Sequence, residues 1–214
     1  MIKNIAIQVF QNKLFWYVFL FAIVWLNSLI GTTDLANWLI ENTLTFLAVL
    51  ILIIYRKKLI FSDLSYFLII AFLCLHVYGS KYTYSENPFG FWIQELFHTS
   101  RNPYDRLVHF CFGFLLYLPF QEYFVKGLKY PVSLANILPV LITLCFSSLY
   151  EIIEWLVADV FFREQGISYL GTQGDIWDAQ KDTAIALSGA LLSFSNHILN
   201  TKLKIIKKQE KRLI

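Results

Sequence analysis

Long stretches without a charged side chain limit the structures that this chain can form more than any other feature. No charged residue lies between Lys13 and Asp34, and the last uncharged stretch runs from Thr183 to Thr201. A helix that crosses a bilayer needs about 20 mainly apolar residues, and the bilayer core offers no water to bond the backbone polar groups. The sequence therefore predicts membrane-spanning helices.

Six segments have this character, and together they predict an all-α, polytopic membrane protein with about six transmembrane helices in one bundle. Only 15% of the residues are charged and the mean hydropathy is +0.55, whereas soluble domains are about 25% charged. We expect a single integral-membrane domain over 1–214, with a basic cytoplasmic tail at 202–214. The expected spans are 14–31, 37–55, 59–79, 104–123, 134–155 and 183–201.

The charges are distributed unevenly between the two ends of these spans. If the N-terminus lies inside, 13 of the 18 Lys and Arg residues lie on the inner side. Cytoplasmic loops carry the excess of Lys and Arg, so we expect both termini in the cytoplasm. Of the 15 acidic residues, 12 lie on the outer side or in the outer ends of helices. This distribution points to a polar site at the extracytoplasmic face.

Two other features exclude particular classes of partner and site. The net charge of +3 gives no basic surface of the kind that nucleic-acid binding requires, so we expect no nucleic-acid partner. The three cysteines lie in apolar runs, where a thiol behaves as a small hydrophobic group, and they predict neither a disulfide nor a zinc site; they are Cys74, Cys111 and Cys145.

Two smaller elements are expected to support the bundle. Within the outer connection 80–103, a turn at Asn87 and Pro88 precedes an amphipathic stretch at 91–97, which fits an interfacial helix or a lid over a site. The last span is rich in small residues, which let helix backbones approach closely in lipid, so we expect it to pack inside the bundle. These residues are Ala184, Ala186, Ser188, Gly189, Ala190 and Ser193.

Ionisable residues inside the expected spans share one depth, near the outer face. Such residues are costly in a membrane and usually face the bundle interior or a water-filled cavity. Asp105 and His109 are four residues apart, as are Asp178 and Asp182, so each pair shares one helix face. Candidate site residues are Asp105, Arg106, His109, Glu151, Glu154, Asp175, Asp178 and Asp182, with Glu41, Asn42 and His76 nearby.

This set of side chains fits several chemistries. Carboxylates and imidazoles bind Mg²⁺, Mn²⁺, Zn²⁺ or iron, so a divalent metal is a candidate cofactor. Paired carboxyl groups also act as general acid and base, and Arg106 is a candidate clamp for an anion. Each residue also has a structural interpretation, as a helix-end charge or as a hydrogen bond between helices. Candidate metal ligands are His76, His109, Glu154, Asp178 and Asp182.

Three motifs at these positions resemble the YjdF-type family of bacterial inner-membrane proteins. The resemblance extends from about the second expected span through the sixth, and it implies a bacterial inner-membrane location but no reaction. A more distant similarity to VanZ-like proteins, which are linked to glycopeptide-antibiotic resistance, lies in the Asp-basic-x-x-His opening and the later Asp/Gly helix. The motifs are Asp105-Arg106-x-x-His109-Phe110, Glu151-x-x-Glu154-Trp155 and Gln173-Gly174-Asp175-x-Trp177-Asp178-x-Gln180-x-Asp182.

These residues favour a site that binds or processes a lipid-linked or envelope-associated group, with membrane lipids as partners. Both binding and catalysis remain open. A small transporter or ion pathway is the main alternative, although polar residues of the inner half are few. A non-catalytic scaffold, in which the polar cluster only holds helices together, is a third hypothesis. The inner polar residues in question are Asp63, Glu122, Ser147 and Ser148.

Overall fold

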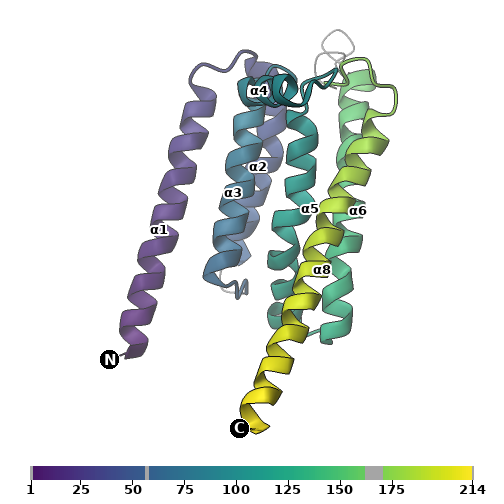
Figure 1. The fold of residues 1–214 in the computed structure, drawn as a ribbon. Coiled ribbons are helices and arrows are strands. Elements are labelled where there is room, and N and C mark those ends of the chain that lie inside the picture. Colours follow the sequence, from purple (N-terminus) through teal and green to yellow (C-terminus); the bar gives the residue numbers. More distant parts are fainter. Residues whose placement is uncertain (1, 56–57, 162–170, 214) are drawn as a thin grey trace.

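The protein is a bundle of helices in the computed structural model, which describes residues 2–55, 58–161 and 171–213 (Figure 1). Every regular element in these ranges is helical, which confirms the predicted all-α membrane bundle. The helices are α1 (Ile2–Leu29), α2 (Leu35–Tyr55), α3 (Asp63–Ser80), α4 (Pro88–Phe97), α5 (Tyr104–Glu122), α6 (Val132–Leu156) and α8 (Asp178–Leu213), with π-helical turns η1 (Tyr123–Gly127) and η2 (Val157–Phe161).

The long helices stand side by side, and the short helix α4 lies across one end of them (Figure 1). Helix α5 is central, because α3, α4, α6 and α8 all pack against it. Helix α1 begins and α8 ends at the end of the bundle opposite to α4 (Figure 1). The basic segment predicted as a tail is helical as far as Leu213, because α8 continues beyond the expected span.

Each expected span overlaps one of the long helices, although α1 and α5 end before the spans 14–31 and 104–123 do, and α3 begins four residues after the start of the span 59–79. The helices differ in how apolar they are. Among the described residues, three helical segments are long and apolar enough to cross a membrane, namely Leu35–Tyr55, Asp63–Ser80 and Val132–Val160. The apolar part of α1, Lys13–Leu29, is shorter, and α5 and α8 carry ionisable residues in their first turns. Membrane crossing by α1, α5 and α8 remains a prediction.

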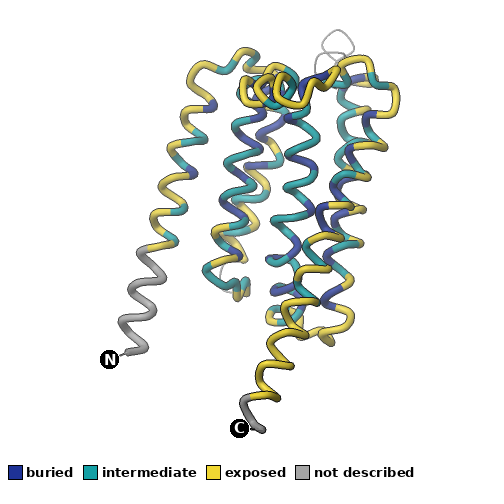
Figure 2. The backbone as a smooth tube through the Cα atoms, in the orientation of Figure 1, coloured by how far each residue is buried: buried dark blue, intermediate teal, exposed yellow. Residues whose placement is uncertain are grey.

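Apolar side chains lie on the outside of the bundle as well as in its core. Figure 2 shows exposed residues along the outward faces of α1 and α2 and along the far part of α8. Leu47 and Ile54 on α2 are examples of such exposed residues. Lipid tails are as apolar as leucine, so contact with them carries no free-energy cost for these faces. The core between α1 and α3 contains Phe21, Leu73 and Val77.

Helices α5 and α8 cross closely because small residues meet at their contact. A Cβ atom on Gly113 of α5 would overlap the carbonyl oxygen of Ala186, and one on Gly189 of α8 would overlap that of Phe110. Ala186 and Ala190 are completely buried there. The predicted close packing of the last helix is confirmed, and it brings the first turns of α5 and α8 together.

Helix α4 is the short helix predicted at 91–97, and it begins slightly earlier. The Asn87 side chain accepts hydrogen bonds from the backbone N–H groups of Phe89 (3.0 Å) and Gly90 (3.2 Å), which caps the helix. The helix ends at His98, whose φ of 51° is left-handed. Trp92 and Phe97 are exposed, and their contact with the membrane interface remains a prediction.

Candidate functional site at one end of the bundle

Three helices bring ionisable side chains to the end of the bundle that carries α4. Helices α5 and α8 begin at this end and α6 finishes there (Figure 1). The first turns of α5 and α8 and the last turns of α6 therefore supply side chains at one depth. The predicted pairs lie on these turns: Asp105 and His109, Glu151 and Glu154, and Asp178 and Asp182.

Two arginines form ion pairs with carboxylates in α8 and in the segment just before it. Arg101 Nη1 forms a buried ion pair with Asp178 Oδ1. Arg106 Nη2 lies 2.7 Å from Asp175 Oδ2 and 3.2 Å from Asp178 Oδ1, and its Nε lies 3.5 Å from Asp182 Oδ1. The guanidinium of Arg106 is thus surrounded by carboxylates of the protein itself. This arrangement does not favour the expected role of Arg106 as an anion clamp.

Hydrogen bonds join the segment before α8 to the segment before α5. The Asn102 backbone N–H donates to Gln173 Oε1 at 2.9 Å, and Gln173 Nε2 donates back to the Asn102 carbonyl at 3.0 Å. Arg101 also donates to the backbone carbonyls of Gly171 and Thr172. Arg101 and Asn102 are not among the residues predicted from the sequence, because these partners lie about 70 residues away and no local pattern reveals such a contact.

Asp175 lies at the edge of the site and stays ionised. Lys181 Nζ donates to both of its carboxylate oxygens, at 3.0 and 2.7 Å, and the Trp177 backbone N–H donates to Oδ1 at 3.1 Å. The hydrogen bond from Lys181 is the main reason why the pKa of Asp175 lies well below its usual range. Asp175 therefore helps to fix Arg106 and the start of α8.

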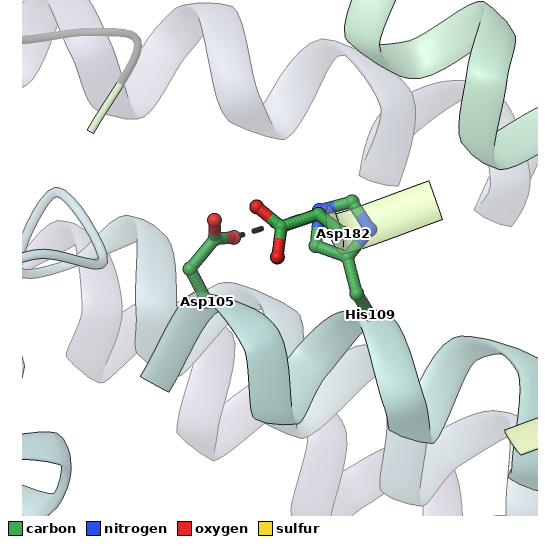
Figure 3. Close-up of side chains that lie close together, drawn as sticks. All are labelled: Asp105, His109 and Asp182. Atoms are coloured by element: carbon green, nitrogen blue, oxygen red, sulfur yellow. Dashed lines mark ion pairs between the residues drawn. The ribbon is translucent and has the colours of Figure 1, made fainter. Parts of the chain in front are cut away.

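His109 lies at the centre of a second, more deeply buried group. Its Nε2 is 3.6 Å from Asp105 Oδ1 and 3.4 Å from Glu151 Oε1, and its Nδ1 is 3.4 Å from Ser147 Oγ. Asp105, His109 and Asp182 point toward one another (Figure 3), and one ligand atom from each lies within 4.8 Å of the others. These ligand atoms are close enough together for one metal ion to contact all three.

A cavity of about 400 Å³ adjoins this group. Six carboxylates line it, whereas the described residues contribute no lysine or arginine to its lining. Trp155 and Ile176 are lining residues that remain 52% and 84% exposed, so the cavity has apolar side chains beside a strongly acidic interior. The lining residues are Asp105, Glu151, Glu154, Trp155, Thr172, Gly174, Asp175, Ile176, Asp178, Ala179, Gln180 and Asp182.

His76 belongs to a neighbouring cluster. Its Nε2 lies 3.3 Å from the Glu41 carbonyl oxygen and its Nδ1 lies 2.5 Å from the Tyr84 hydroxyl. Tyr150 of α6 donates to Glu41 Oε2 at 2.7 Å, which links this cluster to the helix that carries Glu151. Both ring nitrogens of His76 already have partners, so the geometry does not favour the expected ligand role.

Buried polar residues also continue inward from the site. Ser147 lies beside His109, and Thr143 and Asn136 occupy the same face of α6, four and eleven residues earlier. Gln121 Nε2 of α5 donates to Asn136 Oδ1 at 3.1 Å. All four of these residues are buried. The inner half is therefore more polar than predicted from the sequence, because Thr143, Asn136 and Gln121 add to the polar residues expected there.

These features define an all-α integral membrane protein with an acidic cavity between three helices at one end of its bundle. The chain belongs to the DUF2238 family of predicted membrane proteins, whose family model matches residues 13–201. It is similar to the inner membrane protein YjdF of Escherichia coli (strain K12), with 36% identity over 163 residues, which cover 76% of this chain and 78% of YjdF. No solved structure shows a significant match.

The comparisons confirm the predicted resemblance to the YjdF-type family and place the chain among bacterial inner-membrane proteins. The matched range contains the whole candidate site, from α5 to the first turns of α8. The weaker resemblance to VanZ-like proteins has no support in these comparisons.

Proposed function

We propose that this protein binds the polar group of a lipid-linked or envelope-associated molecule at the extracytoplasmic face of the inner membrane. The observation that carries this proposal is the cavity itself, with six carboxylates and two exposed apolar side chains in its lining. A buried group of ionisable residues in a membrane protein is costly, and it commonly marks a functional site.

The distribution of charge supports the proposed orientation of the cavity. The basic residues from 202 to 212 lie on the part of α8 farthest from the site, and Lys126 lies beyond the distant end of α5. Cytoplasmic segments carry the excess of Lys and Arg. In this orientation both termini lie in the cytoplasm and the cavity opens on the opposite side of the membrane.

The shape of the site suits an amphipathic ligand. Trp155 and Ile176 offer apolar contact to a lipid chain, while Glu151 and Glu154 present carboxyl groups to the polar part. These two glutamates are three residues apart on α6, so they share a face. A pair of carboxyl groups can accept and return a proton, so the same arrangement supports processing of the bound group as well as binding.

Lipid retention tests this proposal. The full chain is purified in nanodiscs, and co-purified molecules are identified by native mass spectrometry for the wild type and for a Glu151→Gln, Glu154→Gln double variant. Each hydrogen bond to a charged group is worth about 1.5–3 kcal/mol, so we expect the double variant to retain at least about tenfold less of the ligand.

The matched control is Glu86→Gln, which changes an exposed glutamate outside the cavity lining and is expected to retain the wild-type amount. Equal retention by the double variant, or no bound species in the wild type, would contradict the proposal.

A second candidate function is a proton or ion pathway. It is favoured by the buried polar residues that continue inward from the site, namely Ser147, Thr143, Asn136 and Gln121. Proteoliposomes with a pH-sensitive dye test this candidate, which predicts a proton flux that Thr143→Val reduces.

A further inference from the structure

We propose that Asp105, His109 and Asp182 bind one divalent transition-metal cation, Zn²⁺ or Mn²⁺, and that Glu151 completes the ligand set. The three first-named residues come from the opening turns of α5 and α8, and their side chains face one another (Figure 3). Glu151 approaches the same His109 nitrogen from α6.

The distances around His109 fit a shared cation better than direct hydrogen bonds. His109 Nε2 is 3.6 Å from Asp105 Oδ1 and 3.4 Å from Glu151 Oε1, which exceeds the usual N–H···O range of about 2.7–3.2 Å. Tetrahedral ligands at about 2.0–2.1 Å from Zn²⁺ lie about 3.3–3.4 Å from one another. Both nitrogen-to-oxygen distances are thus close to the spacing of two ligands of one zinc ion.

Two buried carboxylate oxygens next to these atoms have no hydrogen-bond partner among the described residues. They are Asp182 Oδ1 and Glu151 Oε1. Asp182 is only 2% exposed, and the Arg106 Nε that lies 3.5 Å from it also makes no hydrogen bond within the described ranges. An unsatisfied buried charged group costs at least about 1–3 kcal/mol, and a cation bound at these oxygens would remove that cost.

The surroundings of His109 suit a metal ligand. Ser147 Oγ lies 3.4 Å from His109 Nδ1. The other ring nitrogen, Nε2, is the one that faces Asp105 and Glu151. Histidine ligands commonly bond a protein group through their other nitrogen, which fixes the ring orientation. The imidazole favours Zn²⁺ over Ca²⁺, whose usual ligands are all oxygens, and the carboxylates also suit Mn²⁺.

The charge of the site also favours a cation. Arg101 and Arg106 are engaged by Asp175 and Asp178 on one side of the cavity. The carboxylates of Asp105 and Glu151 have no arginine or lysine partner among the described ion pairs. A divalent ion at this group would offset the charge of these two carboxylates, and it would also supply a positive centre for an anionic ligand.

Metal binding is measured with the metal alone, so its outcome is independent of the proposed lipid ligand. The full chain in detergent is treated with a chelator, freed of it and titrated with Co²⁺, whose visible absorption reports nitrogen and carboxylate ligands; Zn²⁺ then competes for the site. Metal content after Zn²⁺ loading is measured by plasma mass spectrometry. We expect one metal ion per chain in the wild type.

Two isosteric variants locate the site. Asp182→Asn and His109→Gln are expected to weaken Co²⁺ binding at least about 100-fold, because each removes a direct ligand and even indirect ligand contacts matter by about 10–100-fold. Ser147→Ala, which removes only the contact to His109 Nδ1, is expected to weaken binding by about 10–100-fold. Size-exclusion profiles and thermal unfolding show whether each variant is folded.

The matched controls are His98→Asn and Glu86→Gln, which change exposed residues of the same types outside the cluster and are expected to bind like the wild type. Absence of Co²⁺ and Zn²⁺ binding in the wild type overturns the inference, as does equal binding by folded Asp182→Asn and His109→Gln. A wild type that retains a lipid but binds no metal would leave the proposed function standing and exclude the metal site.

Discussion

Arg101 and Asp178 form the most deeply buried ion pair of the candidate site, with side chains that are 8% and 7% exposed. Removal of two charges from water costs several kcal/mol each, so a buried pair persists only where additional hydrogen bonds accompany it. Arg101 meets this condition through the carbonyls of Gly171 and Thr172. At the residue scale, Arg101 therefore positions the segment that leads into α8.

Replacement of Arg101 by Met tests this positioning role. Loss of one partner leaves Asp178 buried, with Arg106 as its remaining ion-pair partner among the described residues. We therefore expect the free energy of unfolding to fall by about 3 kcal/mol, at the low end of the range for a broken buried pair. Unfolding in mixed detergent micelles measures this loss. An Arg101→Met, Asp178→Asn double variant removes both charges and is expected to recover part of it; a larger loss in the double variant would contradict this account.

At the scale of elements, the contact between α5 and α8 decides whether the site exists. Asp105, Arg106 and His109 lie on one helix, Asp178 and Asp182 on the other. Gly113 and Gly189 allow the two backbones to meet, because a side chain at either position would overlap a carbonyl oxygen of the other helix. Lipid provides no hydrophobic force between helices, so this close fit supplies much of the attraction.

Gly113→Ala is expected to destabilise the bundle by at least about 1–3 kcal/mol, the usual cost of added volume in a packed interior. Because the added methyl group separates α5 from α8, Co²⁺ binding by the proposed site is expected to weaken as well. Thermal unfolding and Co²⁺ titration measure the two effects. Ser188→Ala changes an exposed residue of α8 and is the control; unaltered stability in Gly113→Ala would show that the crossing tolerates a side chain.

At the scale of the whole molecule, charge and structure divide the bundle into two different ends. One end contains the acidic cavity, α4 and the hydrogen-bonded segments around Asn102 and Gln173. At the other end, α1 begins and α8 finishes (Figure 1). Of the 13 basic residues assigned to the inner side, the 11 that the structure describes belong to segments at or near the second end. Insertion with that end in the cytoplasm follows from the preference of Lys and Arg for cytoplasmic loops.

Cysteine labelling in intact cells tests this orientation. The three native cysteines are first replaced by alanine. In this background, the thiol of a Glu86→Cys variant is expected to react with a membrane-impermeant maleimide added outside the inner membrane. The thiol of a Lys208→Cys variant is expected to react only after the membrane is disrupted. A cytoplasmic marker protein that stays unlabelled shows that the membrane was intact. The reverse pattern would place the cavity in the cytoplasm and contradict the proposed function.

The sequence alone determined the helices and the side chains that share each helix face. Uncharged runs mark the spans, because the bilayer excludes charge and requires internally bonded backbone. Helical periodicity places Asp105 beside His109 and Asp178 beside Asp182. These properties depend on residues within a few positions of one another, so an unaligned sequence is sufficient to predict them.

Only the tertiary structure decided which of these faces meet and how their charges pair. Arg106 contacts the aspartates of α8 rather than the glutamates of α6, and His76 lies against Tyr84 and Glu41 outside the group around His109. Arg101 pairs with Asp178, which lies 77 positions later in the sequence. The rotation and neighbours of each helix depend on close packing, such as that at Gly113, which no local pattern encodes.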